Sequence, residues 1–197
     1  IAPDFSHRQQ VGGLAFLGFH APRSELSRLA EFAFLRTLRR MPRLTLRDVD
    51  LRALETDQVF AVGHVIEAPL AEGISVAVFD GGLPQDHPFG DVAVARDVPG
   101  LSAPVASAVR HGVQVTSAIL HGPLSRAVTP GRPFSRIDHW RVIDDAGDDF
   151  ELMATLDRIV DVLEQNRYEF VSLSLGPDDA MLDDDVHVWT SRLDQLA

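Results

Sequence analysis

Two side chains in the sequence have the types and surroundings that general acid–base chemistry needs, an aspartate at position 80 and a histidine at position 111. Asp80 ends an apolar run and is followed by Gly81 and Gly82, which leave its carboxylate open to close approach. His111 comes 31 residues later and is followed by Gly112. A carboxylate that holds an imidazole in one tautomer prepares that imidazole to accept and donate protons. Each residue alone is more often structural, so the hypothesis depends on their combination.

The segments around these residues predict an α/β fold. Residues 74–79 are apolar at nearly every position, which is typical of a parallel strand buried on both faces. Two more apolar segments, 140–143 and 170–175, enclose a stretch with apolar residues at helical spacing from 152 to 163. A strand, a helix and a strand in this order form a right-handed crossover of a parallel sheet. Functional groups gather at the carboxyl ends of such strands, which is where Asp80 stands.

Two further helices are expected from the pattern. His111 should open a helix that runs towards residue 122. Another helix is expected over residues 186–196, after the acidic run Asp183–Asp185, whose charges would favour the positive end of the helix dipole. A parallel sheet needs a strand after that last helix, and the chain starts at Ile1, so we expect it to be a fragment of a longer protein.

The first fifty residues predict a small β-α-β unit. Residues 12–20 are apolar and Gly-punctuated like a strand, and residues 44–47 alternate like a second strand. Between them, Ser24 is a suitable N-cap for a helix with Leu26, Leu29, Phe32 and Leu35 at helical spacing. We therefore expect three parts: the small unit at 1–50, a linker at 51–72, and the first portion of a larger α/β domain at 73–197.

Three segments, in this order, resemble the motifs of subtilisin-like serine peptidases, the subtilases. Residues 76–82, Val-Ala-Val-Phe-Asp-Gly-Gly, resemble the motif of the catalytic Asp. Residues 111–117, His-Gly-Val-Gln-Val-Thr-Ser, resemble the His motif. Residues 170–177, Phe-Val-Ser-Leu-Ser-Leu-Gly-Pro, resemble the segment whose backbone pairs with the substrate as an added strand. Together the matches cover about residues 70–197.

The resemblance implies a partial subtilisin-like parallel sheet with flanking helices, and a serine endopeptidase that hydrolyses peptide bonds through an Asp-His-Ser triad. Asp80 would orient the imidazole of His111, which would act as general base and then as general acid. Ser174, Leu175 and Gly176 would line the cleft for a peptide or protein substrate. The β-α-β unit would correspond to a propeptide that assists folding and inhibits the enzyme.

The chain also departs from the family pattern. Val113 stands where the family has Thr, Gly81 stands where it has Ser or Thr, and Ser117 replaces a helix Gly. The Gly-Thr-Ser-x-Ala-x-Pro segment that carries the nucleophile is absent, and no Ser lies in a Gly-x-Ser context at a helix start. A second chain or a C-terminal segment would have to supply that Ser, and the isolated chain should not cleave peptides. The alternative is a non-catalytic pseudoprotease or interaction scaffold that keeps the sheet without the chemistry.

Composition excludes several other classes of function. A formal net charge of -11 argues against nucleic-acid binding, and no apolar run approaches the roughly 18 to 20 residues that span a membrane. The absence of Cys excludes disulfides and thiolate chemistry and favours a cytoplasmic location, although many secreted bacterial hydrolases lack Cys as well. The Asp-His pairs at 86–87 and 138–139 lack the spacing of zinc ligands. We therefore predict no cofactor, and only the family resemblance speaks for calcium.

Overall fold

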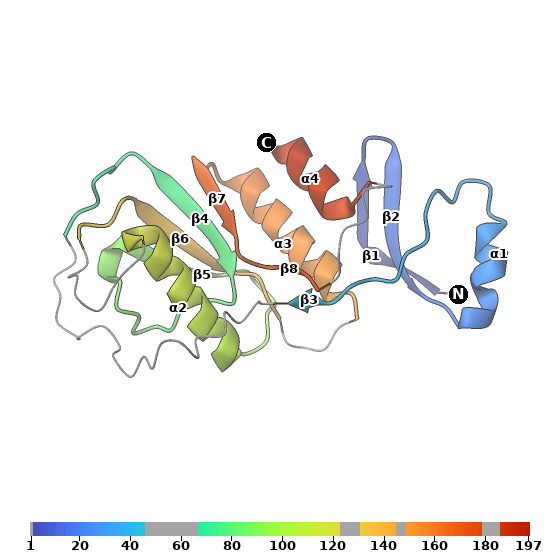
Figure 1. Cartoon of the computed structure of the whole chain (residues 1–197), viewed down its shortest axis with the longest axis horizontal. Coiled ribbons are helices and arrows are strands. Elements are labelled where there is room, and N and C mark those ends of the chain that lie inside the picture. The colour runs from blue at the N-terminus through green and yellow to red at the C-terminus, as the bar shows by residue number, and fades with distance from the viewer. Residues whose placement is uncertain (1, 46–66, 123–130, 145–148, 179–185) are drawn as a thin grey trace. The chain divides into compact units, whose positions relative to one another are not determined.

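The computed structural model describes residues 2–45, 67–122, 131–144, 149–178 and 186–197 (Figure 1). The chain divides into two compact units: Ile1–Leu44, Asp148–Gln165 and Pro177–Ala197 form the first, here the hairpin unit, and Thr45–Gly147 and Asn166–Gly176 form the second, here the sheet unit. These units interleave along the sequence, whereas the predicted parts at 1–50, 51–72 and 73–197 follow one another. Residues 51–66 of the predicted linker lie outside the described residues.

The sheet unit contains a four-stranded parallel sheet. Its strands are β4 (Ser75–Asp80), β5 (Ala93–Asp97), β6 (Arg136–Arg141) and β7 (Phe170–Leu173), in the spatial order β5-β6-β4-β7. The described chain is thus an α/β protein with a parallel sheet and flanking helices, as the sequence predicted. Strand β5, which follows the short 3-10 helix Gly90–Val92, was not expected, because its residues after Ala93 are exposed and only partly apolar.

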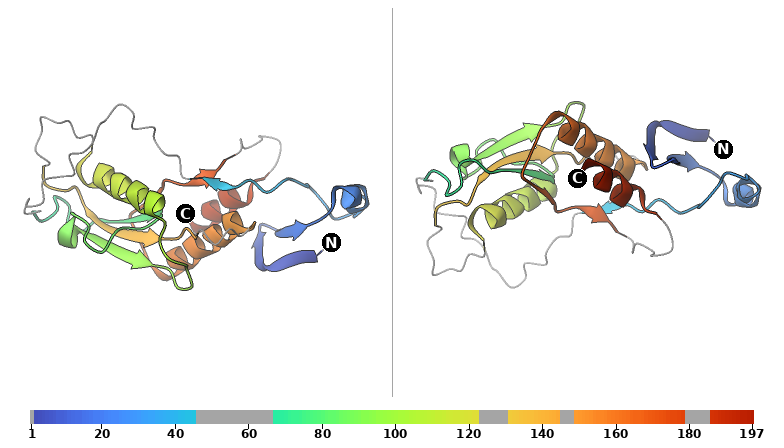
Figure 2. Two further views of the ribbon diagram at one scale, coloured as in Figure 1. Left: turned by 90° about the horizontal axis from the view of Figure 1, so that it is seen from below. Right: turned by 90° about the horizontal axis from the view of Figure 1, so that it is seen from above.

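Helix α2 (Ala106–His121) covers one face of this sheet, and the views of Figures 1 and 2 agree in placing it along β4 and β6. The register pairs Val76 with Ile137 and Val78 with His139 on the face that α2 covers. Val76, Val78 and Ile137 form a buried cluster with Leu120 of α2. Burial of this apolar surface fixes the height of the helix over the carboxyl end of β4.

Two predicted boundaries in the sheet unit were wrong. The strand expected at 140–143 is β6, which starts at Arg136, because alternate residues from Ile137 onwards are buried even though Arg136 and Asp138 are polar. His111 does not open its helix: α2 begins at Ala106, with Val105 as N-cap after Pro104. Residues 106–110 contain no helix breaker, so the helix extends back to this proline and places His111 in its second turn.

The hairpin unit begins with two antiparallel strands, β1 (Ala2–Val11) and β2 (Leu14–His20). Gly12 and Gly13 join them, with φ of 55° and 82°. Both values lie in the left-handed region that a tight hairpin turn requires and that glycine adopts without strain. A short 3-10 helix (Arg23–Glu25) and α1 (Leu26–Ala30) follow.

The predicted β-α-β unit is not formed in this region. Strand β2 pairs with β1, while β3 (Leu44–Thr45) pairs with β8 (Gly176–Pro177), so that β2 and β3 belong to different sheets. The Gly12-Gly13 turn explains the difference, because a strand that can pair with its immediate neighbour through a tight turn does not need a crossover partner. The helix also stops at Ala30, before Phe32 and Leu35, which were expected to extend it.

The hairpin unit is completed by α3 (Glu151–Gln165) and α4 (Val188–Leu196). Trp189 is 4% exposed and donates its indole N–H to the carbonyl of Leu152 at 3.2 Å. His7 of β1 lies 2.7 Å from the carboxylate of Asp157 of α3. The expected helix at 186–196 is therefore present and starts two residues later, whereas the acidic run before it lies outside the described residues.

Candidate active site

The side chains of Asp80 and His111 are joined by a hydrogen bond. Nδ1 of His111 lies 2.9 Å from Oδ1 and 2.8 Å from Oδ2 of Asp80. Asp80 is the last residue of β4, at the carboxyl end of the sheet, and is fully buried, while His111 on α2 is 7% exposed. Because both elements are held by the buried cluster, the pair is part of the fold and not a chance surface contact. The structure therefore brings together the two residues that the sequence motifs single out.

Burial and hydrogen bonding act in opposite directions on the Asp80 carboxyl. Burial raises its pKa, whereas the hydrogen bonds from His111 and from the backbone N–H of Gly81, at 2.6 Å, lower it. Burial is the larger effect. Both oxygens lie within reach of Nδ1 and one also accepts the Gly81 N–H, an arrangement that suits an ionised carboxylate.

The second ring nitrogen of His111 is available for chemistry. Within the described residues, His111 makes its hydrogen bonds to Asp80, through Nδ1. Its other ring nitrogen, Nε2, has no partner there and is not completely buried. Solvent therefore reaches Nε2. An imidazole whose Nδ1–H is held by a carboxylate presents the lone pair of Nε2 outwards, which is the arrangement of a general base.

Glycines seat α2 against the turn that follows β4. A Cβ atom on Gly81 would lie 2.4 Å from Cβ of Ala108, and one on Gly112 would lie 2.2 Å from the carbonyl oxygen of Gly82. The helix thus approaches the turn more closely than side chains would permit. A Ser or Thr at position 81, which the subtilase motif has, would not fit here. The glycine at this position is therefore explained by the close packing of α2 next to Asp80 and His111.

We expect Gly81→Ala to destabilise the sheet unit by about 1 to 3 kcal/mol, because the new methyl group overlaps Ala108. The matched control is Gly73→Ala, because a Cβ atom at that position meets nothing within 4 Å. This variant should leave the stability nearly unchanged. Urea unfolding followed through Trp140 measures this, in a Trp189→Phe background that removes the second of the two tryptophans. Equal stability of the two variants would contradict the close contact between Gly81 and Ala108.

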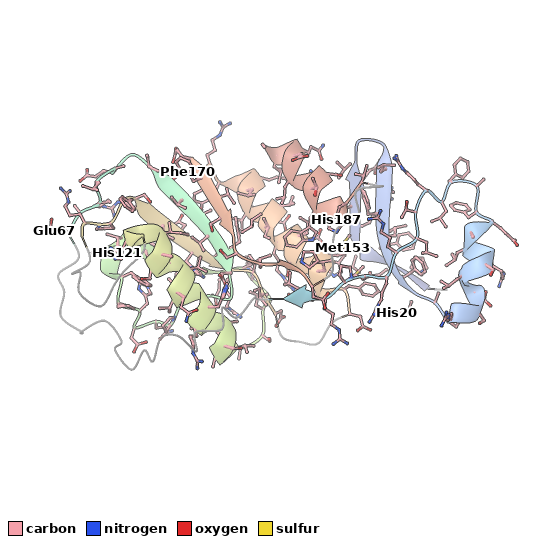
Figure 3. The ribbon with its side chains drawn as sticks, viewed as in Figure 1. His20, Glu67, His121, Met153, Phe170 and His187 are labelled. Carbon is pink, nitrogen blue, oxygen red and sulfur yellow. The ribbon has the colours of Figure 1, made fainter. Side chains whose placement is uncertain are left out.

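The predicted substrate residues follow edge strand β7. Leu173 is in register with Phe79 of β4, so Ser174 continues at the same carboxyl edge as Asp80. Ser174, Leu175 and Gly176 are half-buried, and the hydroxyls of Ser172 and Ser174 lie 3.5 Å apart. Phe170, labelled in Figure 3, stands at the other end of β7 and is 60% exposed. The three residues thus follow β7 at the carboxyl edge of the sheet, and their role in substrate binding stays a prediction.

Sequence reasoning missed two buried polar groups beside the pair. His139 is fully buried, and its Nδ1 lies 2.8 Å from Oγ1 of the equally buried Thr116 of α2. Arg141 is 5% exposed and donates to the carbonyl of Ser102 and to the carboxylate of Asp97, both at 2.8 Å. The alternation of β6 was the signal that could have found both residues, because it places 137, 139 and 141 on one face.

Two other sequence features have local explanations. Val113, which replaces the family's Thr, packs against the buried cluster under α2. Gly100-Leu101-Ser102 is a Gly-x-Ser segment shortly before α2, but its hydroxyl is bonded to Asp144 and not to His111. No serine of the described residues is hydrogen bonded to His111.

The fold and this site define an α/β protein with a buried Asp–His pair at the carboxyl end of a parallel strand. Comparison with protein-family models, with curated proteins and with solved structures found no match. In the described ranges, no three His, Asp or Glu side chains gather as metal ligands. Over the same ranges, none of the helices combines the length and apolar character needed to cross a bilayer.

Proposed function

We propose that the sheet unit carries the acid–base half of a subtilisin-like serine endopeptidase, and that a Ser outside residues 1–197 completes the triad. The observation that supports this most directly is the buried Asp80–His111 hydrogen bond with Nε2 of His111 reached by solvent. The resemblance of three motifs in family order adds the reaction class. The same resemblance assigns Ser174–Gly176 to the lining of the substrate cleft.

The geometry suits acyl transfer as follows. Nε2 of His111 would take the proton of the Ser hydroxyl as that oxygen attacks the peptide carbonyl, and Asp80 would stabilise the resulting imidazolium without itself taking up the proton. Nε2 would then deliver the proton to the leaving amine. The same two residues would activate water in the second half of the reaction, which hydrolyses the acyl-enzyme.

A fluorophosphonate probe on the full-length gene product tests the proposal, because such probes form an adduct only with an activated Ser. We expect one adduct, on a Ser outside residues 1–197, and its loss in His111→Ala. The matched control is His121→Gln, at the end of α2, which should keep the adduct (Figure 3). Absence of an adduct at every probe concentration would favour a non-catalytic scaffold, which is consistent with the lack of a Ser bonded to His111 in the described chain.

A further inference from the structure

One buried stripe of α2 packs closely against the turn after β4 and against the sheet. Ala108, Gly112, Thr116 and Leu120 recur at intervals of four residues, so they share one face of the helix, and all four are buried. Ala108 meets Gly81, and Gly112 meets the carbonyl of Gly82. The next contact along the stripe is a polar one, the hydrogen bond between Thr116 and His139.

His139 contacts this stripe at two successive turns. Its Nδ1 is bonded to Thr116, and a Cβ on Gly112 would lie 2.9 Å from its Cε1 and 3.1 Å from its Nε2. The imidazole edge therefore fills the space that the missing side chain of Gly112 leaves. Gly112 directly follows His111, so the ring of His139 supports the backbone that carries the imidazole of the pair.

His139 is an unusual residue for an interior that only needs filling. It is fully buried, and its Nε2 has no hydrogen-bond partner within the described residues. Leaving a buried ring nitrogen unpaired is unfavourable compared with an apolar side chain of similar shape. Burial, together with the nearby His87 and His111, lowers its pKa to about 4, so it is neutral near pH 7 and does not compete with His111 for Asp80.

Small rotations of α2 have large effects on the pair. A side-chain atom lies ~5 Å from a helix axis, so a rotation of ~10° displaces it by ~1 Å. Such a displacement would break the contact between Nδ1 of His111 and Asp80, which is made at 2.8 Å. Misplacement of a catalytic group by about 1 Å lowers rates by about 100-fold. A directional hydrogen bond at Thr116, five residues after His111, opposes this rotation.

We propose that His139 is a positioning residue for the Asp80–His111 pair, holding α2 through Thr116 and Gly112 in the rotation that places His111 on Asp80. Its catalytic consequence rests on the function proposed above. The positioning itself concerns the geometry of the pair, and it can be measured on residues 1–197 without any peptidase activity.

The test follows the Nδ1–H proton of His111 by NMR of ¹⁵N-labelled protein, with Asp80→Asn to assign the low-field resonance. In Thr116→Val, which keeps the shape and removes the hydroxyl, we expect the resonance to be lost or to exchange with water at least about 10-fold faster. His139→Phe, which keeps a ring in the same space, should behave in the same way. Thr116→Ser, which retains the hydroxyl, should preserve the signal.

The structural control is Leu120→Ala, one turn further along the same stripe. It creates a cavity in the core and should lower stability as much as the other variants or more, yet leave the resonance in place, because the apolar packing of Leu120 sets the height of α2 over the sheet and makes no directional bond against rotation. The inference is overturned if Thr116→Val and His139→Phe keep the wild-type resonance and exchange rate, or if Leu120→Ala loses it equally. In the full-length protein, Thr116→Val should lower kcat with KM unchanged. A full-length protein without peptidase activity would reject the proposed function, while the resonance would still decide the positioning role.

Discussion

In the full-length protein, His111→Ala is expected to lower kcat for peptide hydrolysis by about 10⁶-fold, as loss of one member does in the triad of subtilisin. The reason is that Nε2 of His111 would both take the proton of the nucleophile and protonate the leaving group. Asp80→Asn should cost less, on the order of 10⁴-fold, because the imidazole remains but is held in the wrong tautomer. Steady-state kinetics on a fluorogenic peptide measure both losses.

The double variant separates a triad from two independent effects. If His111 and Asp80 act as a unit, the loss in His111→Ala/Asp80→Asn should equal that of His111→Ala alone, because the partner of Asp80 is already gone. His121→Gln serves as the control for a histidine on the same helix and should retain full activity. Additive losses, or activity that survives His111→Ala, would exclude the proposed mechanism.

Local patterns were sufficient to predict strand β4 and the presence of helix α2, although not its start, at the centre of the sheet unit. The apolar run before Asp80 and the glycines after it describe a buried parallel strand and a tight turn, and both are encoded by neighbouring residues. Local patterns predict a strand and a helix but not which of their side chains meet. The pairing of Asp80 with His111 came from the order and spacing of the motifs that resemble those of subtilases.

The supporting residues depend on contacts between segments that are distant in the sequence. His139 meets Thr116 across 23 residues, and no local pattern in 136–141 shows what faces the histidine. The close approach of Gly81 to Ala108 is a steric relation of the same kind, and the sequence alone showed only that Gly81 departs from the family's Ser or Thr. The prediction for the N-terminal region was wrong for another reason. Gly12 and Gly13, which form the hairpin turn, were assigned to a strand.

Acidification is expected to destabilise the sheet unit between about pH 6.5 and pH 4, through His139. In the unfolded chain this imidazole takes up a proton below its ordinary pKa of 6.5, whereas burial lowers its pKa in the folded protein to about 4. In this window the unfolded state binds more protons, so stability rises with pH and is fully present above about pH 6.5. The shift corresponds to about 3 kcal/mol.

Other groups also change the stability over this pH range, so the test compares variants and does not rely on wild type alone. In the sheet unit, His87 and His121 have pKa values that burial lowers, which adds to the same trend, and Asp80, whose pKa burial raises, acts in the opposite direction. His139→Phe should remove the contribution of His139 and flatten the dependence. Thr116→Val should keep most of it, because that variant leaves the imidazole buried and able to titrate.

Urea unfolding at about pH 7 and about pH 4.5, followed through Trp140 in the Trp189→Phe background, gives the free energy of unfolding of the sheet unit for each variant. The free energy of unfolding of wild type minus that of His139→Phe should fall by about 2 to 3 kcal/mol on acidification. The sign of this change is diagnostic, because a histidine paired with a carboxylate would make the folded protein more stable as the pH falls. A difference that stays constant or grows at low pH would mean that His139 is not buried as a neutral group beside His111.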